Sequence, residues 1–257
     1  IMLRLVARAA ECVIAVSNAT AIQARRYLGV KAERLRVVPE AAAGIFRPVP
    51  KREARAIVER EMGLSAPYIV FVSTIEPRKD HLTLLKAVRN VQGAPLLVLA
   101  GGVGWRCRSI LAAIREEEMS GRVRYLGRVD DRHLPALYSA AEFAVYPSLY
   151  EGFGLPVLEA MACGCPVVAS DSSSLPEVGG KAARYFRAGD SRELARVIQE
   201  LCSDGPGLAA MSAAGLARAK EFSFRKAAAM TLEILRDGVS SQRTRHVEQP
   251  DRDSVAH

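Results

Sequence analysis

The sequence predicts an α/β fold built around a doubly wound parallel sheet. From Tyr68 to Cys202, short apolar runs of strand length alternate with longer segments whose apolar residues recur at helical spacing. Runs such as 69–72 (IVFV) and 143–146 (FAVY) carry no charged residue, which is typical of strands covered by helices on both faces. Strands that alternate with helices form βαβ units, and such units pair their strands in parallel.

The segment before this alternation has a different pattern. Residues 1–38 predict the end of one small α/β unit, whose second helix Ser17 or Asn18 would cap. Residues 39–66 are rich in alanine and proline around a charged helical stretch, and they predict an interdomain linker with a helix leading into the sheet. The elements expected here are a helix at 2–10, a strand at 12–16, a helix to Leu28, a strand at 35–38 and a helix at 52–62.

Residues 67–222 are predicted to form the main domain. Six strands are expected at 69–72, 95–100, 123–126, 143–146, 167–169 and 183–186. Helices are expected at 81–90, 108–119, 131–141, from Pro156 to Gly164, at 191–202 and at 208–221. Ser223 would then cap a further helix, 225–236. Beyond Gly238 the chain is polar, so residues 238–257 are predicted to be a disordered tail.

The stretch 145–169 contains the most informative turn. Glu151 follows the predicted strand 143–146 directly, at the edge where open parallel sheets bind ligands. Gly152 and Gly154 allow backbone amides to approach a ligand closely. A helix that begins near Leu155 directs its free N–H groups to the same place, which favours an anion. Pro156 suits the first helical position, where no N–H is needed.

Glu159 lies eight positions after Glu151 and is expected in the first turn of this helix. Two carboxylates would repel an isolated phosphate, so they indicate hydroxyl donors nearby. A ligand that is both anionic and polyhydroxylated, such as a nucleotide-diphospho-sugar, fits this combination. Simpler interpretations also exist. Glu159 would then only complement the positive end of the helix, Glu151 would be a solvated loop residue, and the glycines would serve a tight turn.

The run YEGFGLPVLE, from Tyr150 to Glu159, continues as AMACGCPVVAS. It resembles the signature of retaining GT-B glycosyltransferases (glycosyl transferases group 1), which share a Glu-x7-Glu element in the donor-binding domain. The resemblance extends from Cys12 to Arg236. It implies a Rossmann-like donor domain at 67–222, a remnant of the amino-terminal acceptor domain in front of it, and absence of most of that acceptor domain from this chain.

The same resemblance implies roles for individual residues. Glu151 would bind sugar hydroxyls, Glu159 a ribose or sugar hydroxyl, and the backbone amides from Phe153 to Leu155 the sugar and phosphate. The loop after strand 123–126 would border the base through backbone contacts of Arg128 and Val129. The helix at 223–237 would cross back toward the amino-terminal domain. No metal is required at the donor site of this family.

The stretch STIEPRKD, residues 73–80, follows the first strand of the main domain. An arginine and a lysine together suit a diphosphate, and they would stabilise the charge that grows on a departing nucleoside diphosphate. The stretch resembles the family's diphosphate-binding loop, with Lys79 at the lysine position and Arg78 beside it. Thr74 stands where many members carry arginine. The alternative is a solvated basic loop.

The glycines at 101, 102 and 104 indicate a phosphate cradle or a plain turn.

Composition excludes several other classes. The chain has 257 residues, 49% apolar and 25% charged, with a formal net charge of +8. Its basic residues are scattered, without an aromatic-interleaved basic stripe, which argues against nucleic acid binding. Five cysteines without a CxxC pair and four histidines without ligand spacing favour a reducing compartment and no metal site. The longest apolar run is too short to span a membrane, and the first residues do not resemble a signal peptide.

The resemblance therefore implies an enzyme, metal-independent and without a cofactor, which retains anomeric configuration as it transfers a sugar from a nucleotide-diphospho-sugar to an acceptor hydroxyl, and the cysteine usage agrees with a cytoplasmic location. The acceptor, a glycan or a lipid-linked molecule, is not identified, and the basic balance is compatible with a peripheral membrane contact at the inner face. The chain holds mainly the donor domain, so it is expected to bind donor and turn over poorly alone. Two alternatives remain: a non-catalytic nucleotide-sugar binding module, and a GT-B epimerase or phosphorylase.

Overall fold

The computed structural model of the chain describes residues 2–247. It divides into two compact units, which are described separately. The larger unit comprises Ala41–Phe222, and the smaller one combines the residues up to Glu40 with those from Ser223 on. The helix predicted inside the linker therefore belongs to the larger unit.

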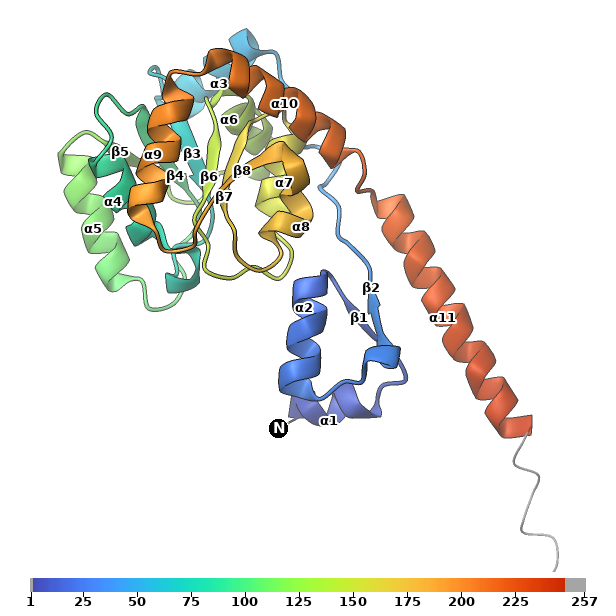
Figure 1. The fold of residues 1–257 in the computed structure, drawn as a ribbon. Helices are drawn as coiled ribbons and strands as arrows, with labels where there is room; N and C mark the ends of the chain where they lie inside the picture. Colours follow the sequence, from blue (N-terminus) through green and yellow to red (C-terminus); the bar gives the residue numbers. More distant parts are fainter. Residues whose placement is uncertain (1, 248–257) are drawn as a thin grey trace, which may run out of the picture. The chain divides into compact units, whose positions relative to one another are not determined.

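The larger unit is built on a parallel sheet, as the alternation of strands and helices predicts (Figure 1). The strand order is β5-β4-β3-β6-β7-β8, and every pairing between neighbours is parallel. The four central strands are buried along almost their whole length because helices cover both faces. The strands are β3 (Tyr68–Val72), β4 (Leu96–Ala100), β5 (Val123–Tyr125), β6 (Ala144–Tyr146), β7 (Val167–Ser170) and β8 (Ala183–Phe186).

The order of the strands reverses at β3. The chain runs outward from β3 through β4 to β5, then returns to place β6 on the other side of β3. The connections that leave β3 and β6 therefore run in opposite directions along the sheet. In doubly wound sheets this reversal is the usual position of a ligand site.

Helices pack on both sides of this sheet (Figure 1). On one side α4 packs against α5 and α9; on the other, α6 packs against α3 and α7, and α7 packs against α10. The helices are α3 (Lys51–Met62), α4 (His81–Arg89), α5 (Arg108–Met119), α6 (Leu134–Ala140), α7 (Leu155–Ala162), α8 (Leu175–Gly179), α9 (Ser191–Cys202) and α10 (Gly205–Ala219), with short 3-10 turns η3 (Pro77–Lys79), η4 (Asp131–His133) and η5 (Gly180–Ala182).

The smaller unit pairs two short parallel strands, β1 (Val13–Ala15) and β2 (Leu35–Val37). The predicted cap is confirmed, because the Ser17 side chain accepts a hydrogen bond of 3.0 Å from the Thr20 backbone N–H. The remaining elements are α1 (Met2–Ala9), α2 (Asn18–Gln23), the π-helical turn η1 (Ala24–Leu28), the 3-10 turn η2 (Ala32–Arg34) and α11 (Phe224–Val247).

The prediction for the end of the chain was partly wrong. Helix α11 runs to Val247, so residues 238–247 are helical although disorder was predicted there. Once a helix is nucleated, each added residue gains one hydrogen bond, and residues such as Gln242 and Arg243 propagate it readily despite their polarity. The rest of the predicted tail, 248–257, lies outside the described residues. Among the helices of residues 2–247, none has the length and apolar character that crossing a membrane requires.

Candidate functional site

Two loops meet at the reversal of the sheet. The loop after β3 contains η3, and the loop after β6 spans residues 147–154. Their backbones are joined directly, because Leu149 donates its N–H to the carbonyl oxygen of Arg78 over 2.9 Å. The loops that carry Lys79 and Glu151 are therefore in direct contact.

An ion pair between Lys79 and Glu151 joins the side chains of the two loops. The ammonium Nζ of Lys79 lies 2.6 Å from Oε1 of Glu151, and about a tenth of each side chain is exposed, 10% and 11%. Ser148 donates its hydroxyl to the same oxygen over 2.7 Å. Burial alone would raise the pKa of Glu151, but the charge of Lys79 and the hydrogen bonds from Lys79, Ser148 and Arg78 outweigh it, so this pKa lies below its usual range.

Arg78 connects the two loops through its guanidinium group. Nη1 donates to the carbonyl oxygen of Tyr150 and to Oε2 of Glu151, each over 2.7 Å. Nε and Nη2 donate to Oε1 of Glu76 over 3.1 and 2.6 Å. Burial lowers the pKa of Arg78, but hydrogen bonds and charges from the two carboxylates raise it overall. Arg78 is thus bound on both sides by protein groups.

Serines at the end of β7 and directly after it hold the loop that carries Glu151. Ser173 accepts a hydrogen bond of 2.8 Å from the Glu151 N–H, and Ser174 donates to the Glu151 carbonyl oxygen over 2.9 Å. Ser170 donates to the carbonyl oxygen of Ser148 over 2.6 Å. Ser173 has a positive φ of 52°, a conformation that is uncommon outside glycine. The serine run therefore fixes the backbone on both sides of the carboxylate.

The start of α7 lies directly after this loop. Gly154 is the residue before the helix, and its φ of +110° is accessible to glycine without strain. Leu155 is the first helical residue, so Pro156 occupies the second helical position and not the first, as was predicted for it. Because Pro156 has no N–H, the first turn offers mainly the amide of Leu155, next to those of Phe153 and Gly154. Gly152 is half-buried, and the Phe153 ring is buried with its centroid 5.8 Å from that of Phe222.

Glu159 lies in a different environment from Glu151. It is the fifth residue of α7, so the expectation that it belongs to the first turn was wrong, because the helix begins at Leu155 and its first turn contains no acidic residue. Burial, with a smaller effect of Asp131, raises the pKa of Glu159 to about 7. Burial thus dominates the surroundings of the half-buried Glu159 carboxyl group, whereas Glu151 contacts two cations.

Thr74 and the predicted glycines lie in the loops after β3 and β4. Thr74 is exposed, and a side chain added at Gly104 would lie 2.8 Å from its Cγ2. A Cβ atom at Gly101, where φ is +147°, would collide with the carbonyl oxygen of Ser73. A β-bridge between Ile75 and Val103 joins the same two loops. These glycines therefore permit close packing against the loop that carries Lys79.

Arg128 and Val129 border a cavity of about 540 Å³ in the larger unit. The cavity is lined from the end of α3 and from the loop that follows β5. Arg128 is exposed and Val129 half-buried. The other lining residues are Glu61, Met62, Gly63, Arg124, Tyr125, Leu126, Asp130 and His133.

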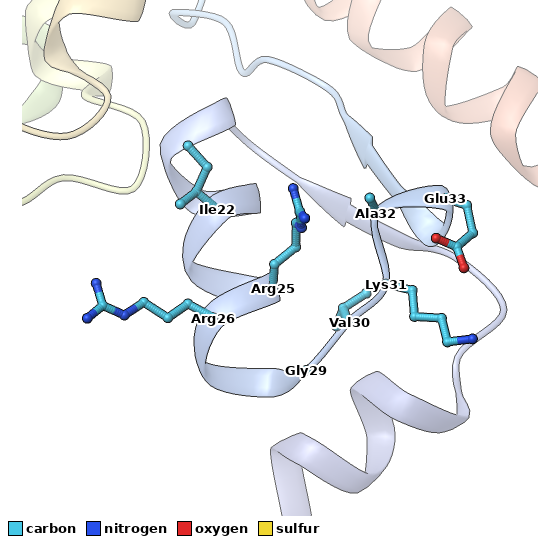
Figure 2. Close-up of a pocket in the computed structure, with 8 residues that line it drawn as sticks. All are labelled: Ile22, Arg25, Arg26, Gly29, Val30, Lys31, Ala32 and Glu33. Atoms are coloured by element: carbon cyan, nitrogen blue, oxygen red, sulfur yellow. The ribbon is translucent and has the colours of Figure 1, made fainter.

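A second hollow, of about 620 Å³, lies within the smaller unit (Figure 2). It is lined by α2, η1 and the segment after it, and it contains three cations, Arg25, Arg26 and Lys31. Figure 2 shows that these side chains point in different directions, Arg26 and Lys31 to opposite sides. Because the charges do not converge on one point, this hollow lacks the geometry that binds an anion.

Sequence reasoning missed several groups that shape the site. Glu76, Ser148, Ser173 and Ser174 contact Arg78 or Glu151, and Asp131 influences Glu159. The signal for the serines was present, because DSSS directly follows a buried strand of the same sheet. Their contact with the Glu151 loop depends on β6 and β7 being neighbours. Among the described residues, no group of three or more His, Cys, Asp or Glu side chains is arranged to hold a metal ion.

Comparisons with known proteins agree with this architecture. The family model for glycosyl transferases group 1 matches residues 66–204. The chain is similar to the O-antigen chain mannosyltransferase B of Escherichia coli, with 34% identity over 87% of this chain and 60% of that protein. It is also similar to a D-inositol 3-phosphate glycosyltransferase of Mycobacterium avium, with 33% identity over 73% of this chain and 45% of that protein. The chain thus spans less than two thirds of these relatives.

Solved structures share the fold. Sucrose-phosphate synthase from Thermosynechococcus elongatus superposes with a TM-score of 0.80 and 28% identity, over 93% of this chain and 61% of that one. Anabaena Alr3699/HepE in complex with UDP-glucose gives a TM-score of 0.81 with 23% identity, over 91% of this chain and 66% of that one. At this low identity the second likeness concerns the fold alone. Both structures support the α/β architecture with a parallel sheet.

Proposed function

The chain belongs to the glycosyl transferases group 1 family, and from this premise we propose that the loops after β3 and β6 bind a nucleotide-diphospho-sugar. The observation that carries the proposal is the buried pair of Lys79 and Glu151 at the reversal of the sheet. A cation suits the diphosphate and a carboxylate suits sugar hydroxyls. The pair supplies both at one place where such sheets bind ligands.

In the bound state, Lys79 neutralises the diphosphate and stabilises the charge that grows on it as it departs. The amides of Phe153, Gly154 and Leu155 contact the sugar and the phosphate at the positive end of α7. Glu151 accepts hydrogen bonds from sugar hydroxyls, each of which contributes about 1.5–3 kcal/mol because the acceptor is charged.

The nucleoside lies on the side of α7 away from this pair. Glu159 accepts a hydrogen bond from a ribose hydroxyl, which a carboxyl group with a pKa near 7 can do in either protonation state. The base lies against the backbone of Arg128 and Val129, which border the cavity after β5. Glu151 and Glu159 therefore serve separate hydroxyl-bearing parts of one ligand, which explains why their surroundings differ.

The complete protein transfers this sugar to an acceptor hydroxyl with retention of anomeric configuration, without a metal ion. No residue of the site needs to act as a general base, because the departing phosphate itself takes the acceptor proton. The acceptor is a glycan or a lipid-linked molecule, bound mostly by parts of the protein outside this chain. This fits a chain that spans 60% of the Escherichia coli mannosyltransferase.

Mannose is the first sugar to test. The Escherichia coli relative is a mannosyltransferase, and so is the MMP alpha-(1->4)-mannosyltransferase of Mycolicibacterium hassiacum, which is 31% identical over 93% of this chain. The loop of Glu76, Pro77, Arg78 and Lys79 also resembles that of the mannosyl- or rhamnosyl-type subgroup.

Calorimetric titration with GDP-mannose, UDP-glucose, GDP and UDP tests the proposal. We expect one nucleotide-sugar to bind, and Lys79→Met and Glu151→Gln each to weaken its affinity at least about tenfold, a loss near 1.4 kcal/mol. Lys51→Met is the matched control, because Lys51 forms a half-exposed pair with Glu142 at the opposite edge of the sheet. Binding that is unchanged in both site variants would contradict the proposed site.

A further inference from the structure

The contacts of Arg78 indicate a role different from that of Lys79. We propose that Arg78 is a positioning residue, which holds the carboxylate of Glu151 in the orientation that receives a sugar hydroxyl, and that Glu76 fixes Arg78 in turn. This inference rests on the proposed function of the site. It replaces the expectation, drawn from the family resemblance, that Arg78 binds the diphosphate together with Lys79.

The hydrogen bonds of Arg78 to protein groups leave few of its N–H donors for a phosphate. A guanidinium group has five N–H donors. One on Nε and one on Nη2 bind Glu76, and the two on Nη1 bind the Tyr150 carbonyl oxygen and Glu151, so four of the five are used inside the protein. To bind a diphosphate through its planar fork, Arg78 would have to release either Glu76 or its partners in the loop after β6.

The remaining acceptor capacity of Glu151 lies on the oxygen that Arg78 contacts. A carboxylate has about two acceptor positions on each oxygen. Those of Oε1 are used by Lys79 at 2.6 Å and Ser148 at 2.7 Å. Oε2 receives one bond, from Arg78 at 2.7 Å. The open position is therefore on Oε2, and Arg78 determines the direction in which it points.

Glu76 supplies the counterpart that keeps Arg78 in place. Its side chain is 12% exposed, whereas that of Arg78 is 37% exposed. A long side chain at this exposure has several accessible rotamers, and ordering it is entropically unfavourable. Two donors of Arg78 converge on one oxygen of Glu76, which fixes the rotation of the guanidinium group. Removing Glu76 should therefore weaken the hold on Glu151 through Arg78, which contacts both carboxylates.

The test compares ligands with and without the sugar. In calorimetric titrations, Arg78→Met should lower the affinity for GDP-mannose or UDP-glucose about tenfold, but the affinity for GDP or UDP less than about twofold. Lys79→Met should lower the affinity for both kinds of ligand. Glu76→Leu should behave like Arg78→Met, and Glu76→Gln, which keeps an acceptor oxygen, should retain most of the affinity. Arg184→Met is the control, because Arg184 pairs with Glu200 on an exposed surface.

A double variant distinguishes positioning from direct contact. If Arg78 acts through Glu151, adding Arg78→Met to Glu151→Gln should change the nucleotide-sugar affinity less than about twofold. The proposal would be overturned if the affinity losses of the two single variants multiplied in the double variant. It would also be overturned if Arg78→Met lowered the affinity for GDP or UDP as much as that for the nucleotide-sugar, because this would show direct phosphate binding.

A ligand-free measurement keeps this inference separate from the proposed function. Carbon-13 NMR of the Glu151 carboxyl group should show its pKa rise in Arg78→Met, because a neighbouring cation and its hydrogen bond are removed. An unchanged Glu151 titration would refute the positioning role. If the wild type binds none of the four nucleotides, the proposed function fails, while this titration still decides whether Arg78 holds the carboxylate.

Discussion

The ammonium group of Lys79 lies 2.6 Å from a carboxylate oxygen of Glu151, although 72 positions separate the two residues in the chain. The distance is short because β3 and β6 are neighbours in the sheet and both loops leave at the same edge. A cation and a carboxylate are thus brought together where the strand order reverses, and this juxtaposition underlies both proposals.

Loss of one member of this pair should destabilise the fold. Lys79→Met leaves Glu151 buried with less compensation, so the free energy of unfolding should fall by about 2–4 kcal/mol, measured by urea denaturation. Lys51→Met should change it by less than about 1 kcal/mol, because the Lys51 side chain is 52% exposed. The double variant Lys79→Met/Glu151→Gln should recover part of the loss. Equal effects of the two lysine substitutions would contradict a buried pair.

Glu159 should make stability depend on pH near neutrality. Its folded-state pKa of about 7 lies above the ordinary value of 4.5, so the folded chain binds more protons between these values. Stability should therefore decrease as pH rises from about 4.5 to about 7. The glutamine in Glu159→Gln cannot ionise. The free energy of unfolding of this variant should therefore exceed that of the wild type by on the order of 2 kcal/mol at pH 8, and by little at pH 4. Parallel stability curves for the two proteins would disprove the raised pKa.

His81 should act in the opposite direction. Burial, and to a lesser extent the charge of Lys79, lowers its pKa to about 3, and its ring packs 4.7 Å from that of Phe71. The unfolded chain binds the proton below about 6.5, so stability should fall as pH drops beneath that value. Urea denaturation at pH 7.5 and pH 5 should show that His81→Leu removes about 2 kcal/mol of this loss. A variant with the wild-type slope would rule out a buried neutral histidine.

Gly101 and Gly102 offer a matched pair of substitutions. Gly101→Ala places a Cβ against the Ser73 carbonyl oxygen in a backbone conformation of φ +147°, so it should destabilise the fold by about 3 kcal/mol or more. A Cβ at Gly102 meets nothing within 4 Å, so Gly102→Ala should change stability by less than about 1 kcal/mol. Thermal unfolding compares the two. Similar melting temperatures would mean that the loops are not packed as described.

The strands and helices were largely predictable because their patterns are local. A short apolar run of β-branched and aromatic residues such as 69–72 indicates a covered strand, and the spacing in 108–119 and 191–202 gave the bounds of α5 and α9. The continuation of α11 was not predictable in this way. Residues 238–247 carry no apolar stripe, so no local pattern distinguishes a polar helix from a disordered segment.

The candidate site was predictable residue by residue but not as an arrangement. A carboxylate or a basic pair at the end of a strand is visible in the sequence, as Glu151 and Lys79 were. Strand order is not, so the contact between them could not be foreseen, nor could the serines after β7 that hold the Glu151 loop. The engagement of Arg78 by Glu76 requires side-chain geometry, which spacing alone does not give.

The most direct test is a crystal structure of the chain with the nucleotide-sugar that calorimetry selects. The account predicts the diphosphate within hydrogen-bonding distance of Lys79 Nζ and the amides of residues 153–155, with a sugar hydroxyl on Oε2 of Glu151 and the ribose at Glu159. A ligand bound away from the loops that follow β3 and β6, or a phosphate oxygen held by Arg78 after it has left Glu151, would contradict it.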